Sequence, residues 1–268
     1  MKNKIRGEFI LKFLIVGDVC GRPGREAFRK YVPELKKEHI IDVVVVNGEN
    51  IAGGRGISRK TLDEIYRAGA DIVTSGNHIW DQKEIVSFID DEPFLIRPAN
   101  YPEGAPGKGY CIYPFKAKNI GVINVSGRTF MPPMDCPFQK VDEILKEIKN
   151  QCDIILVDIH AEATSEKIAM GFYLDGKVTC VVGTHTHVQT ADNRILPKGT
   201  AYISDLGMVG PYNSSLGINV NNAIDKFITC RPVRFEMAEG PNIFSAVVLE
   251  LAEDNSVKSF ERILFNEE

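Results

Sequence analysis

Apolar and polar positions alternate in short blocks over the first hundred residues. Short apolar runs predict strands, and longer mixed runs predict helices, in the order strand 11–16, helix 25–37, strand 43–46, helix 58–68, strand 71–74 and helix 81–90. Pro33 is expected to break or kink the first helix. Ser58 is a candidate cap for the second. Strands that alternate with helices in this way are typical of a layered α/β fold with parallel strands.

The pattern changes after residue 100. Two β-type runs at 110–115 and 119–125 predict an antiparallel pair. Further elements are expected as a helix at 138–150, strands at 154–159, 178–183 and 200–204, and a closing hairpin formed by 243–251 and 257–264. This order fits a mixed sheet, or two packed sheets flanked by helices. With no repeat or long linker, we expect one domain over residues 11–268, preceded by a leader extension at 1–10.

Polar residues whose side chains could bind a ligand or act in catalysis follow the predicted strands. The strand ends read Gly17-Asp18, Asn47-Gly48-Glu49-Asn50, Ser75-Gly76-Asn77-His78, Asp158-Ile159-His160 and Gly183-Thr184-His185-Thr186-His187. Ligands of α/β sheets gather at the carboxyl ends of strands, so these five segments can meet at one site.

The residue types at these ends suit divalent cations. The candidate metal ligands are Asp18, Glu49, Asn50, Asn77, His160, His185 and His187. Carboxylates, amides and imidazoles fit manganese, iron(II), magnesium or zinc, and no thiolate cluster competes. Seven ligands exceed the needs of one tetrahedral ion, and the two oxygens of Glu49 can bridge two ions. If the backbone stays extended past residue 184, His185 and His187 share one face.

Each residue taken alone also has an ordinary interpretation. Asp18 could cap a helix, Glu49 could be a solvated loop charge, Asn77 a turn residue and His160 a core histidine. The set weakens these interpretations, because four of the five histidines stand at strand ends beside Asp, Glu or Asn. The glycines after the first strand do not have dinucleotide-binding spacing, and the Gly-rich stretch 53–56 lacks the Lys-Ser/Thr of a P-loop.

Composition narrows the function classes. The net charge of -4 argues against a broad nucleic-acid surface. Six cysteines without a CxxC pair are expected to be reduced, mostly buried thiols. The N-terminal apolar run is interrupted by Lys12 and lacks a small-residue cleavage site, and no apolar stretch could cross a bilayer. We therefore expect a cytoplasmic protein.

At these motifs the chain resembles the calcineurin-like metallophosphoesterases and, within them, the YmdB-type bacterial cyclic nucleotide phosphodiesterases. The segment from Gly17 to Arg25 and the segment Asn47-Gly48-Glu49-Asn50 are similar to that branch. The usual Asp-x-His of the superfamily is Asp18-Val19-Cys20 here, and the usual bridging Asp is Glu49, with Asn50 as the replacement ligand. The resemblance implies a four-layer αββα sandwich and two divalent ions per chain, iron or manganese before magnesium or zinc. One ion would be held by Asp18, Asn50 and His187, the other by Asn77, His160 and His185, with Glu49 bridging.

The implied reaction is hydrolysis of cyclic nucleotide phosphodiesters, 2′,3′-cyclic before 3′,5′-cyclic, by a hydroxide that bridges the metals. His78 is the candidate general acid, and Arg22, Arg55 and Arg128 are candidate phosphate contacts. The expected partner is a small phosphodiester, without membrane contact or long nucleic acid; a homo-oligomer is left open. The alternatives are a nuclease or phosphomonoesterase with the same metals, and a non-catalytic regulatory protein that binds metal and nucleotide.

Overall fold

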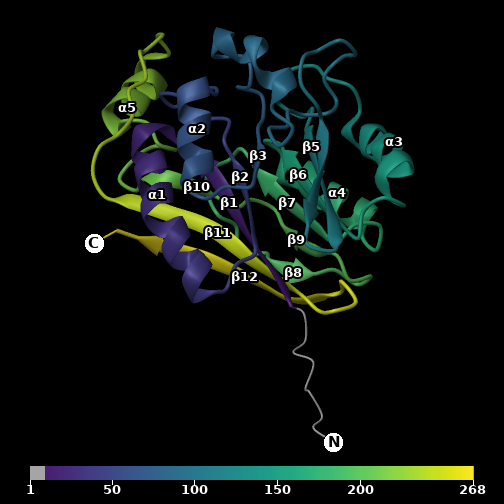
Figure 1. Cartoon of the computed structure of the whole chain (residues 1–268). Helices are drawn as coiled ribbons and strands as arrows, with labels where there is room; N and C mark the ends of the chain where they lie inside the picture. The colour runs from purple at the N-terminus through teal and green to yellow at the C-terminus, as the bar shows by residue number, and fades with distance from the viewer. Residues whose placement is uncertain (1–9, 268) are drawn as a thin grey trace, which may run out of the picture.

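Two six-stranded sheets pack face to face in the computed structural model, which describes residues 10–267 (Figure 1). The first sheet has the order β12-β11-β10-β1-β2-β3 and consists of β1 (Leu11–Val19), β2 (Val43–Asn47), β3 (Ile72–Thr74), β10 (Met208–Pro211), β11 (Asn242–Leu251) and β12 (Val257–Asn266). The second has the order β4-β5-β6-β7-β9-β8 and consists of β4 (Tyr110–Phe115), β5 (Lys118–Ser126), β6 (Ile154–His160), β7 (Cys180–Thr184), β8 (Arg194–Ile195) and β9 (Ala201–Ile203). The predicted leader, apart from residue 10, lies outside the described residues.

Helices cover the outer face of each sheet. Helices α1 (Gly21–Glu38) and α2 (Arg59–Arg67) pack on the first sheet, and α3 (Pro137–Ile148) and α4 (Thr164–Leu174) pack on the second (Figure 1). A further helix, α5 (Val220–Thr229), lies near the start of α1. Among the described residues, no helix combines the length and apolar character needed to cross a membrane.

The apolar runs of the sequence are explained by burial on both strand faces. In β1, Phe13 and Ile15 pack between the two sheets, whereas Leu14 and Val16 pack under the helices of the first sheet. A strand with two buried faces reads as a continuous apolar run rather than an alternation. The arrangement confirms the predicted four-layer αββα sandwich.

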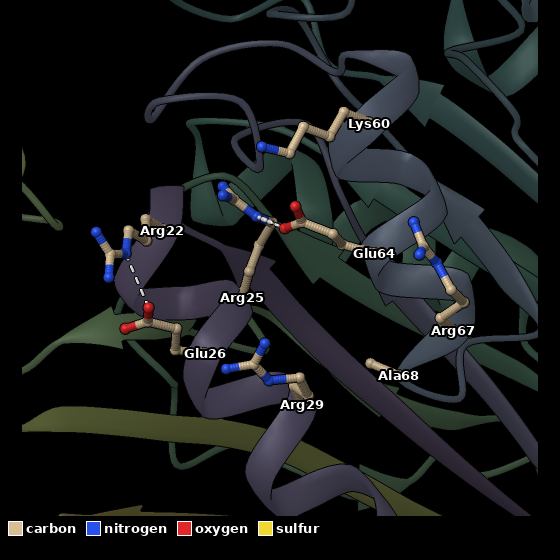
Figure 2. A pocket seen from close by; sticks show the side chains of 8 residues that line it. All are labelled: Arg22, Arg25, Glu26, Arg29, Lys60, Glu64, Arg67 and Ala68. Carbon is tan, nitrogen blue, oxygen red and sulfur yellow. Dashed lines mark hydrogen bonds and ion pairs between the residues drawn. The ribbon is translucent and has the colours of Figure 1, made fainter.

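The order of elements decides where the site can form. Strands β1, β2 and β3 are parallel neighbours joined through α1 and α2, so both helices begin at the carboxyl edge of the first sheet. A groove with charged walls separates these two helices (Figure 2). In the second sheet, β5, β6 and β7 are also parallel. The antiparallel pair β4–β5 and the closing hairpin β11–β12 are confirmed.

Two predictions about helices were wrong, and two further helices were not predicted. Helix α1 begins at Gly21 and continues through Pro33, whose position on the exposed side lets water replace the lost hydrogen bond. The helix expected at 81–90 consists of two 3₁₀ turns, η1 (Lys83–Ser87) and η2 (Ile89–Asp91). Between them Phe88 leaves the helical conformation and buries its ring. Helices α4 and α5 had no predicted counterpart. The six cysteines are free, although only Cys20, Cys111 and Cys180 are buried.

Candidate dimetal site

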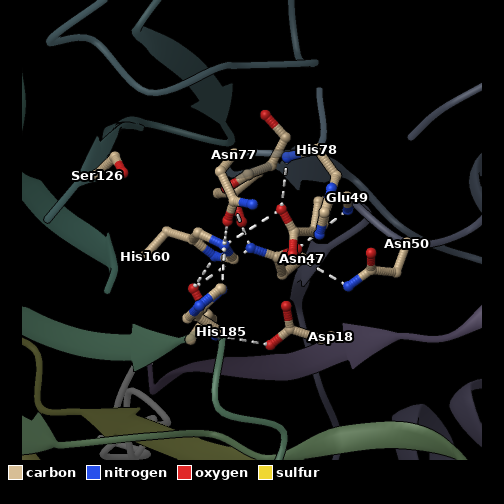
Figure 3. A network of polar contacts seen from close by, with 12 residues as sticks. Asp18, Asn47, Glu49, Asn50, Asn77, His78, Ser126, His160 and His185 are labelled. Atoms are coloured by element: carbon tan, nitrogen blue, oxygen red, sulfur yellow. Dashed lines mark hydrogen bonds and ion pairs between the residues drawn. The ribbon is translucent and has the colours of Figure 1, made fainter. Parts of the chain in front are cut away.

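The predicted metal ligands meet where the carboxyl ends of the two sheets face each other (Figure 3). In the first sheet, β1 carries Asp18 near its end, and the loops after β2 and β3 carry Glu49, Asn50 and Asn77. In the second, β6 ends at His160, and β7 leads into His185 and His187. Segments that lie up to 169 positions apart in the sequence thus supply one cluster, as the parallel strand order requires.

One group of side chains surrounds the Nε2 atom of His160. This atom lies 2.9 Å from Oδ1 of Asn77, 3.2 Å from Oε2 of Glu49 and 3.1 Å from Nδ1 of His185. His160 and Glu49 are buried, and His185 is half-buried. Four potential ligand atoms therefore face one small space, and the two imidazole nitrogens need a proton or a cation between them.

A second group adjoins the first through Glu49. Nε2 of His187 lies 3.8 Å from Oδ1 of Asp18 and 3.2 Å from Nδ2 of Asn50. The Asn50 amide also donates to Oε1 of Glu49 over 3.0 Å. The ligand atoms of Asp18, Glu49 and His187 all lie within 4.8 Å of one another, as do those of Glu49, His160 and His185. Glu49 is common to both groups.

Two buried oxygens in this cluster have no hydrogen-bond partner. They are Oδ1 of Asp18 and Oδ1 of Asn50, and both belong to the second group. A buried acceptor without a partner costs roughly 1–3 kcal/mol, and a charged one costs more. A cation beside these atoms would satisfy both. The set of oxygen and imidazole donors therefore fits divalent metal ions, which a fold of this class also implies.

Burial and neighbouring charges shift the pKa values of the side chains in this cluster. Burial raises the pKa of Asp18 to about 7, although His187 and His160 oppose it. Burial also lowers the pKa of His185 to about 3, and the neighbouring His160 adds to this effect. For His160, burial would lower the pKa, but the Glu49 carboxylate outweighs it and raises the pKa to about 9. Bound cations would favour ionised carboxylates and neutral imidazoles here.

A buried network behind the ligands holds His160 in place. The Thr184 hydroxyl accepts a hydrogen bond from Nδ1 of His160 over 2.9 Å and donates one to Asp158 over 2.8 Å. Asp158 is buried and also accepts from Thr74 and Asn47. Sequence reasoning missed these residues. Their signal is local, because Thr184 directly precedes His185 and Asp158 stands two positions before His160.

The backbone after β7 is not extended. The condition under which His185 and His187 would share one face is therefore not met. His185 and His187 have φ angles of 96° and 64°, in the left-handed region. Contacts with other segments accompany this conformation: the backbone N–H of His185 donates to Asp18, and Nδ1 of His187 lies 3.1 Å from the carbonyl oxygen of Leu216. As a result, the two histidines belong to different groups.

A cavity of about 250 Å³ opens over the cluster. His78 and Arg55 line it, and Nδ1 of His78 lies 3.0 Å from the Asp81 carboxylate. Arg22 and Arg128 are not among its lining residues: Arg22 pairs with Glu26 in the groove of Figure 2, and Arg128 is exposed. An apolar wall that sequence reasoning did not foresee consists of Leu216, Ile218 and Met237.

Comparison with known proteins identifies the family. A family model described as YmdB-like protein matches residues 14–263. The chain belongs to the YmdB-like family. A relative from Bacillus subtilis (strain 168), named 2′,3′-cyclic-nucleotide 2′-phosphodiesterase, is 51% identical over 260 residues, which cover 96% of this chain and 98% of the relative. The resemblance found in the sequence is therefore confirmed.

Solved structures of similar chains share the fold. A crystal structure titled as a novel phosphatase from Mycoplasma pneumoniae has a TM-score of 0.92 and 35% identity, and covers 97% of this chain and 95% of that one. A crystal structure of a hypothetical protein from Thermus thermophilus has a TM-score of 0.91 and 40% identity, covering 96% of this chain and 100% of that one. Both similarities extend over nearly the whole sandwich.

Proposed function

We propose that this YmdB-like chain is a dimetal phosphodiesterase that hydrolyses cyclic nucleotides, with 2′,3′-cyclic nucleotides the preferred class and 3′,5′-cyclic nucleotides the second. The observation that carries the proposal is the pair of ligand groups that share Glu49 and leave two buried oxygens unpaired. The name of the Bacillus subtilis relative supports the substrate class.

The division of the ligands gives each residue a role. Asp18, Asn50 and His187 would hold one ion, and Asn77, His160 and His185 the other, while Glu49 would serve both because it belongs to both groups. The several imidazoles argue against magnesium, and the family resemblance favours iron or manganese over zinc. When bound, two such ions acidify water to supply a nucleophile and offset charge on the phosphoryl group.

His78 is the residue proposed to protonate the leaving oxygen. Its side chain lines the cavity and is 25% exposed, so it can reach a substrate. The Asp81 carboxylate at Nδ1 fixes the ring and leaves Nε2 for the substrate. Arg55, the one arginine among the cavity-lining residues of the described chain, is the favoured phosphate contact. The position of Arg22 in another groove argues against such a role for it.

A substrate panel with manganese- or iron-loaded enzyme tests the proposal. We expect 2′,3′-cyclic nucleotides to be cleaved fastest, 3′,5′-cyclic nucleotides more slowly, and nucleoside monophosphates and internal RNA linkages slowest. Faster cleavage of monophosphates would establish a phosphatase, and faster cleavage of internal linkages a nuclease. Failure to hydrolyse any of these, or the generic diester bis-p-nitrophenyl phosphate, would establish a non-catalytic protein. Elemental analysis should find close to two ions per chain; one at saturation would overturn the dimetal site.

A further inference from the structure

A groove between α1 and α2 concentrates positive charge on the outside of the first sheet (Figure 2). Its volume is about 520 Å³, and it is lined by Arg22, Arg25, Arg29, Lys60 and Arg67 together with Glu26, Glu64 and Ala68. Five cationic side chains thus face two carboxylates, in a chain whose net charge is -4. This local excess points to an anionic ligand.

The groove begins beside the metal cavity. Cys20, which lines that cavity, directly precedes α1, and the cavity residues Gly54 and Arg55 stand shortly before α2. Both helices connect parallel strands, so they run in the same direction, away from the carboxyl edge where the ligands gather. The Arg25 guanidinium also donates to the carbonyl of Ile51, next to the ligand Asn50. The groove therefore leads away from the site of chemistry.

Among the described residues, three of the five cations that line the groove are not engaged in ion pairs, although Arg67 also donates to the backbone carbonyl of Asp63. Within residues 10–267, Arg29, Lys60 and Arg67 are exposed and form no ion pair, whereas Arg22 and Arg25 pair with Glu26 and Glu64. The arginines of α1 are three and four positions apart, so they start from one side of the helix and all line the groove, although the Arg22 guanidinium is turned toward Glu26 (Figure 2). They extend about 10 Å along the helix axis. This length spans two or three consecutive phosphates of an extended single strand, whose neighbouring phosphates are roughly twice as far apart as the 3.4 Å axial rise per residue of one duplex strand.

We propose that the groove binds the phosphate backbone of a short single-stranded RNA whose 3′ end, closed as a 2′,3′-cyclic phosphate, is hydrolysed at the metal site. This rests on the proposed function. Water adds to phosphorus, one P–O bond of the ring breaks, and the products are a terminal phosphomonoester and a free hydroxyl, with no co-reactant. A cyclic mononucleotide has no second phosphate to place in the groove. The groove is too short for extended nucleic acid, in keeping with the acidic net charge.

Chain length of the substrate gives the first test. Values of kcat/KM are measured for uridine 2′,3′-cyclic phosphate and for oligouridylates of two, four and six nucleotides with the same cyclic end. We expect kcat/KM to rise with length and level off near four nucleotides. For the tetranucleotide, log KM should rise with log salt concentration with a slope of about 2, because each of about three phosphate contacts contributes about 0.7. A flat length series overturns the proposal.

A pair of variants gives the second test. Arg29→Ala/Arg67→Ala should lower the ratio of tetranucleotide to mononucleotide kcat/KM by roughly 5- to 30-fold, as expected for two exposed charge contacts. Both side chains are exposed, so the fold should tolerate the change. The control Lys146→Ala/Lys149→Ala removes two exposed charges at the end of α3, on the other outer layer, and should keep the ratio.

The outcomes separate this proposal from the function on which it rests. If the wild type cleaves the mononucleotide but the groove variant keeps the ratio, the RNA groove is wrong and the phosphodiesterase stands. If no cyclic end of any length is cleaved, the function itself is wrong. If the groove variant instead loses binding to phosphatidylglycerol vesicles while the ratio is unchanged, the groove is a membrane-docking site and the RNA proposal is overturned.

Discussion

The Thr184 hydroxyl lies 2.9 Å from Nδ1 of His160 and donates its own proton to Asp158 over 2.8 Å. Because the hydroxyl proton is used on Asp158, the hydroxyl oxygen is an acceptor toward His160. Nδ1 of His160 must then carry the ring proton, and Nε2 is left to face Asn77, Glu49 and His185. A hydrogen bond to the far nitrogen is the usual device that fixes a metal-binding imidazole.

Replacing Thr184 with valine should weaken metal binding without removing a ligand. The isosteric side chain keeps the volume but leaves Nδ1 of His160 and one Asp158 oxygen without their partner. We expect the metal dissociation constant to rise roughly 10- to 100-fold. Thermal stability should also fall, because buried polar atoms lose their hydrogen-bond partner. Titration of metal-free protein with manganese measures this. Thr184→Ser retains the hydroxyl and should stay near the wild type; equal affinity of the valine variant would show that Thr184 does not position His160.

Asp18→Asn should affect the metal-free and metal-loaded proteins in opposite ways. Asp18 is fully buried and its Oδ1 has no hydrogen-bond partner, so in metal-free protein the carboxylate is costly. An amide of the same shape removes the charge. We expect the Tm of the chelator-treated variant at pH 8 to equal or exceed that of the wild type, whereas the rise in Tm on adding manganese should largely disappear.

Calorimetry of both forms distinguishes this from a general loss of stability. A variant that unfolds earlier than the wild type even without metal would mean that Asp18 stabilises the fold through contacts other than a cation. The backbone hydrogen bond from His185 to Oδ2 is preserved by the Asn carbonyl, so it should not contribute to the difference.

The strands and most of the site could be predicted because their signals are local. A strand buried on both faces, such as β2 with its four valines, ends at a polar residue, and the end of a parallel strand is where ligands gather. The left-handed backbone at His185 and His187 could not be predicted, because non-glycine residues rarely adopt it and contacts with Asp18 and Leu216 accompany it. Such contacts depend on tertiary structure rather than on neighbours in sequence.

Other features were missed for related reasons. Strand β10 is four residues long and lies between β1 and β11, so its pairing depends on segments far away in the chain. Helix α5 exposes Phe227 and Ile228, so its apolar residues do not follow the pattern of a helix with one buried face. The basic groove needs two helices side by side, and neither helix alone carries a run of positive charge.

Gly76→Ala should close the metal site while leaving the strands intact. A Cβ at this position would lie 2.3 Å from Nε2 of His160 and 2.4 Å from Oε2 of Glu49, which are two of the ligand atoms of the first group. Neither side chain can withdraw without leaving its hydrogen bonds. We expect loss of about one ion per chain and of most activity, measured by elemental analysis and diester turnover. Gly53→Ala, where a Cβ meets nothing within 4 Å, should keep its metal at a cost of about 1 kcal/mol for its positive φ. Full metal occupancy in the Gly76 variant would show that the two ligands can rearrange.

The roles of Glu49 and His78 can be distinguished when metal content and turnover are measured on the same variants. Glu49 belongs to both ligand groups, so Glu49→Ala should empty the site and abolish activity in parallel. The His78 ring bonds Asp81 at the rim, while only its backbone N–H contacts Glu49, over 3.2 Å. His78→Ala therefore keeps that backbone contact and should retain near-normal metal, yet lose turnover roughly 10²- to 10⁴-fold if the ring is the general acid. The loss should be much smaller for a diester whose leaving group is p-nitrophenolate, which needs no proton, than for a cyclic nucleotide. An equal loss with both substrates would mean that His78 positions the phosphate rather than protonating the leaving oxygen, and an emptied site would make His78 a ligand.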